Sequence, residues 1–184
     1  GQTLTRCMRI AEGWRDTRNR FISLELAEDL PQMMGSARLV TQCVINAVSN
    51  AVKYSNEGDA VTLRARLTDE GDLVIEVVDT GIGIDPDQIE FVTKPFYRAG
   101  GVSTRAATDS VGLGLSLVDA YVRVHGGRLE IFSQPGLGTN VRMTFPAARL
   151  FTADDAAPED APEPPPGPDD SPRDDNVIDF RNKF

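Results

Sequence analysis

The chain of 184 residues carries a formal net charge of −9 and contains two cysteines and one histidine. A chain of this length is expected to form one domain with some residues to spare. No apolar run is long enough to cross a bilayer and the first residues contain no hydrophobic signal core, so we expect a soluble, cytoplasmic protein with no membrane contact. Cys7 and Cys43 match no metal or redox spacing, and nothing indicates a nucleic-acid partner.

The acidic residues are concentrated at the C-terminus. From Phe151 onward the chain has ten acidic residues, three basic residues and seven prolines. Such a segment has too few apolar side chains to offset the entropy cost of ordering, so we predict an acidic, proline-rich, disordered tail over residues 151–184. Its last apolar residues, from Val177 to Phe184, indicate either a short docking motif or a frayed end, and a frayed end is the commoner case.

The first part of the chain shows two kinds of periodicity. Apolar residues recur at helical spacing between Leu4 and Trp14, which predicts a short amphipathic helix. Alternation of apolar and polar residues predicts strands over 22–26 and 61–67, and a third strand runs from Leu73 to Val78. The last two strands flank a turn and are expected to pair in antiparallel fashion. Two further strands, over 128–133 and 139–145, complete the predicted sheet.

The most informative pattern lies between Asn46 and Tyr54. Asn46, Asn50 and Lys53 recur at i, i+4 and i+7 and therefore share one face of a helix. The opposite face is apolar: Val44, Ile45, Val48, Ala51 and Val52. Asparagine offers a neutral oxygen to a hard cation such as Mg²⁺, lysine offers a positive charge to phosphate, and Tyr54 offers a flat ring. An ordinary solvent-exposed helix shows the same stripe, so the pattern alone leaves both interpretations open.

Asp79 closes the third strand with the parity of that strand's apolar residues, so we predict that its carboxylate faces the core side. A buried carboxylate requires hydrogen-bond donors from the protein or from a ligand, because an unpaired buried charge is costly. A turn containing Gly81 and Gly83 follows directly. Glycines there allow a backbone to approach a ligand closely, although a plain tight turn explains them almost as well.

Glycine-rich sequence also surrounds the next predicted helix. Residues 91–111 show no clear period, and so long a loop in a compact domain is usually functional or disordered. Gly112-Leu113-Gly114-Leu115 then opens a helix running to His125, and its N-H groups and positive dipole end suit a phosphate. Thr139 has the parity of the apolar residues in the last strand and is predicted to face inward.

In this order, the features resemble the catalytic, ATP-binding domain of sensor histidine kinases, in the wider group that includes gyrase, mismatch-repair and heat-shock chaperone ATPases. The resemblance covers about residues 4–146. It implies a two-layer α/β sandwich with a mixed, mostly antiparallel sheet, helices on one face and an ATP-lid loop between them. It also implies a dimerisation-hairpin end or connecting helix over residues 1–17 and the catalytic domain over residues 18–150.

The resemblance implies a role for each matching residue. Asn46 and Asn50 would form the first box, with Asn50 as the Mg²⁺ ligand. Lys53 would lie by the phosphates of ATP and Tyr54 against adenine. Asp79 would accept a hydrogen bond from the adenine amino group.

The remaining positions follow in chain order. Residues 91–111 would form the lid, with Phe96 as its anchor and Arg98 as a phosphate contact. Thr139 would join the adenine network through water. The other expected ATP-binding residues are the glycines and leucines of the two glycine boxes: Gly81, Gly83, Gly112, Leu113, Gly114 and Leu115.

The implied activity is that of a protein histidine kinase domain, which binds ATP and Mg²⁺ and donates the γ-phosphate to a histidine on a separate dimerising helical hairpin. Its partners would be that phosphoacceptor hairpin and a downstream response regulator. The only histidine here, His125, ends a helix, where we expect it to interact with the helix C-terminus. The chain is therefore expected to be a monomeric fragment whose parent is a homodimer, with or without a membrane anchor, or a kinase without its own acceptor.

Two alternatives share the fold. A regulatory module would bind ATP without transferring phosphate, and an anti-sigma-type protein serine kinase would phosphorylate a hydroxyl group. Such serine kinases and the related ATPases usually have an acidic residue where this chain has Asn46. An amide cannot act as a general base, so the resemblance favours a histidine kinase that hydrolyses ATP slowly.

Overall fold

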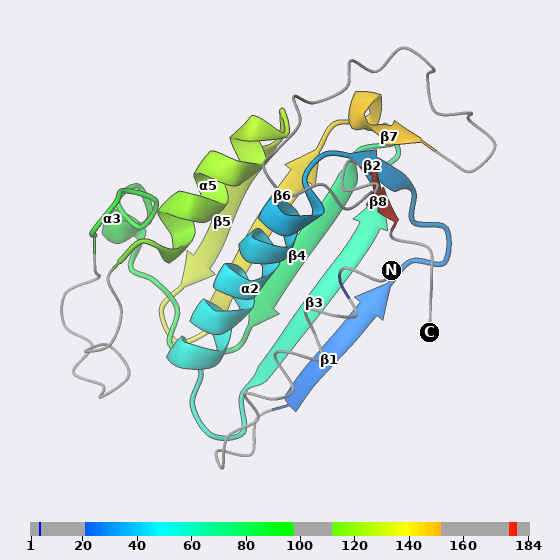
Figure 1. Ribbon diagram of the computed structural model, residues 1–184. Helices are drawn as coiled ribbons and strands as arrows, with labels where there is room; N and C mark the ends of the chain where they lie inside the picture. Colours follow the sequence, from blue (N-terminus) through cyan, green and yellow to red (C-terminus); the bar gives the residue numbers. More distant parts are fainter. Residues whose placement is uncertain (1–3, 5–20, 98–111, 152–176, 180–184) are drawn as a thin grey trace.

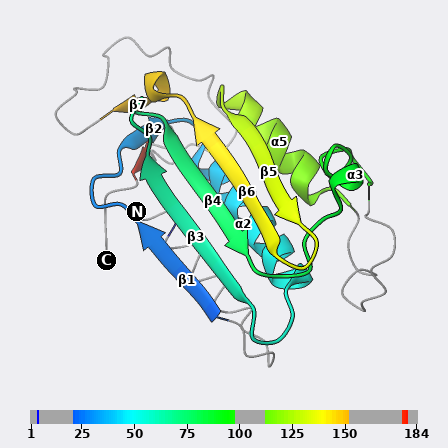
Figure 2. The ribbon, with the colours of Figure 1, turned by 180° about the vertical axis from the view of Figure 1, so that it is seen from behind.

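Two helices lie on one face of a five-stranded sheet, in the computed structural model that describes Leu4 and residues 21–97, 112–151 and 177–179 (Figure 1). No helix of these residues covers the opposite face of the sheet (Figure 2). The strand order is β1-β3-β4-β6-β5, formed by β1 (Phe21–Leu26), β3 (Ala60–Leu67), β4 (Leu73–Asp79), β6 (Gly138–Phe145) and β5 (Arg128–Gln134). The helices on the covered face are α2 (Ala37–Tyr54) and α5 (Gly114–Val124).

The sheet is antiparallel except at one edge, where β1 pairs with β3 in parallel. A parallel pair needs a crossover connection, and α2 lies between β1 and β3 in the chain and supplies it. The expected two-layer α/β fold with a mixed, mostly antiparallel sheet is confirmed. The predicted antiparallel pair of β3 and β4 is confirmed as well.

A second, smaller sheet was not expected from the sequence. It has the order β7-β2-β8 and consists of β7 (Leu150–Phe151), β2 (Gln32–Met34) and β8 (Val177–Asp179). The frayed end expected for the C-terminus is wrong for β8, because its three residues pair with β2 in antiparallel fashion. Phe151, which was assigned to the tail, belongs to β7. Residues 152–176 and 180–184 of the predicted disordered tail lie outside the described residues.

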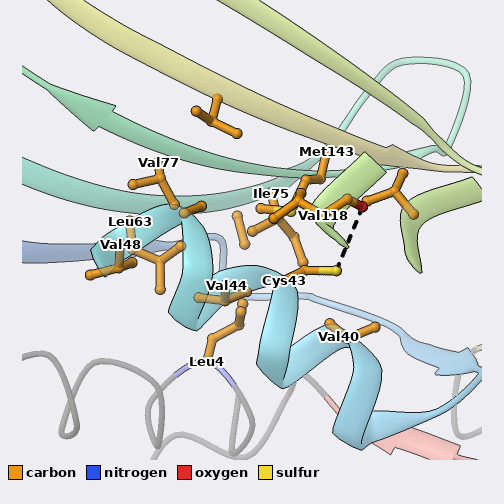
Figure 3. Close-up of a cluster of buried hydrophobic side chains, with 14 of the residues drawn as sticks. Leu4, Val40, Cys43, Val44, Val48, Leu63, Ile75, Val77, Val118 and Met143 are labelled. Atoms are coloured by element: carbon orange, nitrogen blue, oxygen red, sulfur yellow. Dashed lines mark hydrogen bonds between the residues drawn. The ribbon is translucent and has the colours of Figure 1, made fainter. Parts of the chain in front are cut away.

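The apolar face of α2 packs on the sheet as predicted, and forms the main core with inward residues of β3, β4 and β6 (Figure 3). Cys43 is buried in this core, and its thiol lies 3.9 Å from the carbonyl oxygen of Val118 in α5. Burial raises the pKa of Cys43 to about 12, so its thiol stays protonated and behaves as a small apolar group. Leu4 is fully buried in the same core, whereas the rest of the predicted N-terminal helix, with Cys7, lies outside the described residues.

His125 links the two helices. Its Nε2 accepts a hydrogen bond from the backbone N-H of Ser36 at 3.0 Å, and its Nδ1 lies 2.7 Å from the carbonyl oxygen of Tyr121. Ser36 is the N-cap of α2 and His125 is the C-cap of α5. These partners require the neutral tautomer with the proton on Nδ1. The predicted interaction with the helix C-terminus is therefore confirmed, and the same ring also fixes the start of α2.

Charged side chains alternate in sign across the face of the sheet that no described helix covers. Glu25, Arg64, Glu76, Arg142 and Glu130 are cross-strand neighbours from β1 to β5. Glu76 is only 6% exposed, and its Oε1 accepts hydrogen bonds from Arg142 Nε and Asn140 Nδ2, each at 2.9 Å. Burial alone would raise the pKa of Glu76, but these bonds and the arginine charges hold it below the usual value.

The other described helices are short. They are α3 (Pro86–Ile89), which begins after the N-cap Asp85, and the 3-10 helix η1 (Ala147–Arg149). None of the described helices is long and apolar enough to pass through a membrane.

Candidate functional site

The polar face of α2 lies against the start of α5. Asn46 Nδ2 donates to the carbonyl oxygen of Gly114 at 3.5 Å, and Gln42 Nε2 donates to Asn46 Oδ1 at 2.9 Å. A Cβ atom added at Gly114 would lie 3.2 Å from Asn50 Nδ2, so α5 begins directly beside the Asn50 amide. The fold thus joins two motifs that were expected to act together but are more than sixty residues apart.

The Asn50 side chain is half-buried and, within the part of the chain that the structure describes, forms no hydrogen bond. Its amide oxygen has the hardness and neutrality that suit Mg²⁺. The described residues contain no cluster of three His, Cys, Asp or Glu side chains that could hold a metal by themselves. A magnesium ion at Asn50 would therefore take most of its ligands from phosphate and water, as Mg²⁺ commonly does in nucleotide sites.

The last turn of α2 is attached to the turn that follows Asp79. The carbonyl oxygen of Tyr54 accepts a hydrogen bond from Ile82 N-H at 3.1 Å, and Lys53 Nζ lies 5.1 Å from the centre of the Tyr54 ring. A Cβ atom at Gly81 would collide with the Tyr54 carbonyl, and one at Gly83 would collide with the carbonyl of Gln134. Close packing within the protein therefore accounts for both glycines of this turn, as the tight-turn interpretation proposed.

Asp79 faces the core side of the sheet, as its parity predicted, and is 7% exposed. Its Oδ1 accepts a hydrogen bond from Gly81 N-H at 2.9 Å, and the backbone N-H of Thr139 also bonds to the carboxyl group. Burial raises the pKa of Asp79 to about 6, with a smaller contribution from the charge of Asp59, and the two backbone bonds oppose the shift. A carboxylate has about four acceptor positions, so two N-H groups leave room for a donor from a ligand.

Thr139 lies directly across from Asp79 in the pairing of β4 with β6. On its other side it pairs with Ser133 of β5, and the hydroxyl oxygens of Thr139 and Ser133 are 2.9 Å apart. Sequence reasoning did not identify Ser133. The available signal was parity, because Ser133 is a polar residue on the same face of β5 as Leu129 and Ile131.

The predicted lid is described only at its start. Phe96 has a backbone φ of 66°, and its N-H donates to the carbonyl oxygen of Gly112 at 2.9 Å, which closes the base of the loop. Its ring, the expected anchor, is 70% exposed. The rings that pack together are Phe91 and Tyr97, with centres 5.6 Å apart, and Lys94 Nζ lies 4.4 Å from the centre of the Phe91 ring. Residues 98–111, including Arg98, lie outside the described residues.

The helix predicted to begin at the second glycine box does begin there. The N-cap of α5 is Leu113, and no side-chain cap hydrogen bond forms there among the described residues. The first-turn N-H groups of such a helix lack intrahelical partners and carry the positive end of the dipole. Leu115 packs against the core, so it fixes the position of this turn beside Asn50.

The matching family is described as "Histidine kinase-, DNA gyrase B-, and HSP90-like ATPase", and the match covers residues 35–149. The chain belongs to this ATPase family. Several relatives and solved structures that match the chain are named as histidine kinases.

The chain is 45% identical over 109 residues to the histidine protein kinase DivJ of Caulobacter vibrioides. The matched region covers 59% of this chain and 18% of that protein. It is 33% identical over 129 residues to the cell-division control histidine kinase PdhS of Brucella abortus, which covers 66% of this chain and 12% of that protein. The chain thus spans less than a fifth of the length of these relatives.

Several solved structures are similar over most of the chain, among them MprB and ShkA. The mycobacterial sensor histidine kinase MprB has a TM-score of 0.69 at 25% identity, with 79% of this chain and 93% of that chain covered. Full-length ShkA in complex with AMPPNP has a TM-score of 0.70 at 25% identity, with 83% of this chain and 30% of that chain covered. In ShkA, a non-hydrolysable ATP analogue is bound to a protein of this fold.

Proposed function

We propose that this chain is the catalytic part of a two-component histidine kinase, with its catalytic domain over residues 18–150. It binds ATP with Mg²⁺ and donates the γ-phosphate to a histidine on a separate, dimerising helical hairpin. The observation that carries this proposal is the buried Asp79 carboxylate, which has lone pairs available. It ends β4 beside the C-terminal end of α2, the helix that presents Asn46 and Asn50.

The base would be recognised at Asp79. An ionised carboxylate only accepts hydrogen bonds, and the 6-amino group of adenine is a donor. Guanine has a carbonyl oxygen at the same position and would face the carboxylate with an acceptor. Tyr54, joined to the same turn through Ile82, would pack its ring against the base.

The phosphates would lie between α2 and the start of α5. Asn50 would hold Mg²⁺, and a bound Mg²⁺ neutralises charge on the phosphate oxygens. Lys53, Arg98 and the N-H groups of Gly112, Leu113, Gly114 and Leu115 would bind those oxygens. Gly81 would keep the adenine turn close to α2, and Gly83 would keep it close to the end of β5. Phosphoryl transfer depends mainly on such positioning and charge balance.

We expect transfer to an imidazole in preference to hydrolysis, because Asn46 is an amide where the related ATPases usually have an acidic residue. Asn46 accepts from Gln42 and donates to Gly114, and it cannot remove a proton from water. His125 is not the acceptor, since it is 3% exposed and both ring nitrogens are hydrogen-bonded. The acceptor histidine would therefore lie on a helical hairpin of the homodimeric parent, and we assign the end of that hairpin to residues 1–17. A response regulator would receive the phosphate next.

A transfer assay tests the proposal. The chain is mixed with a purified phosphoacceptor hairpin of a related kinase and γ-labelled ATP, and Asn50→Ala serves as the inactive control. Acid-labile, alkali-stable label on the hairpin is the expected result. ATP binding without transfer to any cognate hairpin would instead indicate a regulatory module, and acid-stable phosphoserine on a partner would indicate a protein serine kinase.

A further inference from the structure

We propose that Ser133 fixes the direction of the Thr139 hydrogen bond and thereby makes the site more selective for adenine over a 6-oxopurine. Ser133 is then a positioning residue that acts on the base through Thr139. The inference deepens the proposed ATP site and rests on it.

The Ser133 hydroxyl joins three separate segments. It accepts a hydrogen bond from the backbone N-H of Ile84 at 2.8 Å, in the turn that follows Asp79. It donates to the carbonyl oxygen of Gly138 at 2.9 Å, and it lies 2.9 Å from the Thr139 hydroxyl. One side chain of β5 therefore fixes both the adenine turn and the start of β6.

Counting protons gives the direction of the third bond. A serine hydroxyl has one proton, and a carbonyl oxygen can only accept, so the bond to Gly138 uses that proton. The short contact with Thr139 is then a hydrogen bond only if Thr139 donates to Ser133. The single hydroxyl proton of Thr139 is thereby committed, and Thr139 presents only lone pairs to the rest of the site.

The consequence for the base follows from the acceptors that remain. Asp79 accepts and, in this arrangement, Thr139 also accepts. A water shared by the two would use both of its protons on them and would present a lone pair to the base. The adenine amino group can donate to that lone pair. The 6-oxo group of hypoxanthine or guanine cannot, so it would be left without a partner in a largely desolvated position.

Removing the Ser133 hydroxyl should release the Thr139 proton. Thr139 could then donate to the water, and one water proton would become available for a 6-oxo group. Selectivity should fall although neither residue that faces the base has changed. Weaker packing alone would reduce the affinity for both nucleotides and leave their ratio unchanged.

The test measures the affinities of the purified chain for ATP and ITP by calorimetry with Mg²⁺ present. The two bases differ in the 6-substituent and in the proton that N1 carries in the 6-oxo base. In Ser133→Ala the preference for ATP should fall about fivefold, the effect of one hydrogen bond. Ser133→Thr keeps the hydroxyl and should restore the wild-type ratio. Should Ser133→Ala not fold, Ser133→Cys replaces the oxygen with a weak acceptor of similar shape, and the same fall is expected.

Thr139→Val provides the second arm of the test. In a Thr139→Val background, Ser133→Ala should leave the ATP-to-ITP ratio unchanged, because the hydroxyl whose direction it controls is absent. A Ser133→Ala protein that binds ATP with the wild-type ratio would overturn this inference alone. A wild-type chain that fails to bind ATP would overturn the proposed function itself.

Discussion

The carbonyl oxygen of Tyr54 accepts a hydrogen bond from the N-H of Ile82 at 3.1 Å. This bond joins the last turn of α2 to the turn that positions the Asp79 carboxylate. The same helix presents Asn46, Asn50 and Lys53. The two halves of the proposed ATP site, one for the phosphates and one for the base, are therefore joined by a direct backbone contact. Substitutions at either half should change nucleotide binding without requiring a change in the fold.

The affinity for ATP should rise between pH 5 and pH 7. Burial raises the pKa of Asp79 to about 6, and only the ionised carboxylate is a pure acceptor for the adenine amino group. The ionised fraction would rise from about one tenth to about nine tenths over this range, so we expect up to about tenfold tighter binding. Titration calorimetry at several pH values measures the effect. The phosphates of ATP also titrate in this range, and they do so equally in an Asp79→Asn variant. The pH dependence of ATP binding that remains in this variant is therefore subtracted from that of wild type. The same pH dependence of affinity in both proteins would contradict the assignment of Asp79.

The contribution of Asp79 to the stability of the nucleotide-free chain should fall as the pH rises, whereas the affinity for ATP should increase. The pKa of Asp79 is higher in the folded chain than the ordinary value of 3.8, so the group stabilises the fold most when it is protonated. That stability is complete below pH 3.8 and is lost as the pH rises through about 6. Asp79→Asn should therefore be more stable than wild type at pH 7, by at most about 3 kcal/mol, and should lose this advantage near pH 4.

Urea unfolding at both pH values measures this difference. Asp69→Asn, at an exposed carboxylate in the turn after β3, is the matched control and should change stability by less than about 0.5 kcal/mol. The reciprocal outcome, with Asp79→Asn less stable than wild type at pH 7, would contradict a net destabilising effect of burying the Asp79 carboxylate.

Asn50→Ala should remove the dependence of ATP binding on Mg²⁺. Without the amide oxygen, binding in the presence of Mg²⁺ should weaken by about tenfold or more, and binding in EDTA should be unchanged. Ser49→Ala changes an exposed neighbour on the same helix and is the matched control. An equal loss of affinity with and without Mg²⁺ would mean that Asn50 supports the fold of the site and does not hold the cation.

Much of this arrangement could be predicted because side-chain periodicity over long elements is reliable. The two faces of α2 follow from a period maintained over 18 residues. The inward position of Asp79 follows from the alternating direction of side chains along β4, where Asp79 shares the parity of Ile75 and Val77. The position of His125 as a C-cap follows from the two glycines after it. Each of these features depends on local sequence alone.

The features that were missed depend on pairing between distant segments. β2 and β8 have three residues each, too few for any period to be visible, and each becomes a strand only through its partners. Parity indicates that Ser133 faces inward, but its contacts with Ile84 and Thr139 depend on the register of β5 with β6 and on the path of the turn after β4. Sequence patterns within one segment do not encode that register.

Arg142→Ala should destabilise the fold through Glu76. The substitution removes a 2.9 Å hydrogen bond to a buried carboxylate. Among the described residues, the charge then keeps Asn140 and the more distant Arg66. The expected cost is about 1.5 to 3 kcal/mol. The pKa of Glu76 is held below its usual value, so the contribution is present at neutral pH and is lost as the pH falls through the acid range.

Unfolding of wild type and Arg142→Ala should therefore differ at pH 7 and converge toward pH 3. Arg64→Ala is the matched control in the same row of charges. Its partner Glu25 is more than half exposed, so the expected loss is below about 1 kcal/mol. Equal losses in the two variants would contradict the importance of burial at Glu76.

Truncation after Phe151 should leave the affinity for ATP unchanged. The described end of the tail, β8, pairs with β2, which precedes the N-terminal end of α2. Tyr54 is at the other end of α2, and the two ends of this helix are about 27 Å apart at the usual rise per residue. Changes at sites so far apart are usually independent to within about twofold in an equilibrium constant. The contrary result would be a higher affinity for ATP in the truncated chain and the same higher affinity in a full-length Ile178→Pro variant. That result would show that β8 docking and ATP binding are coupled.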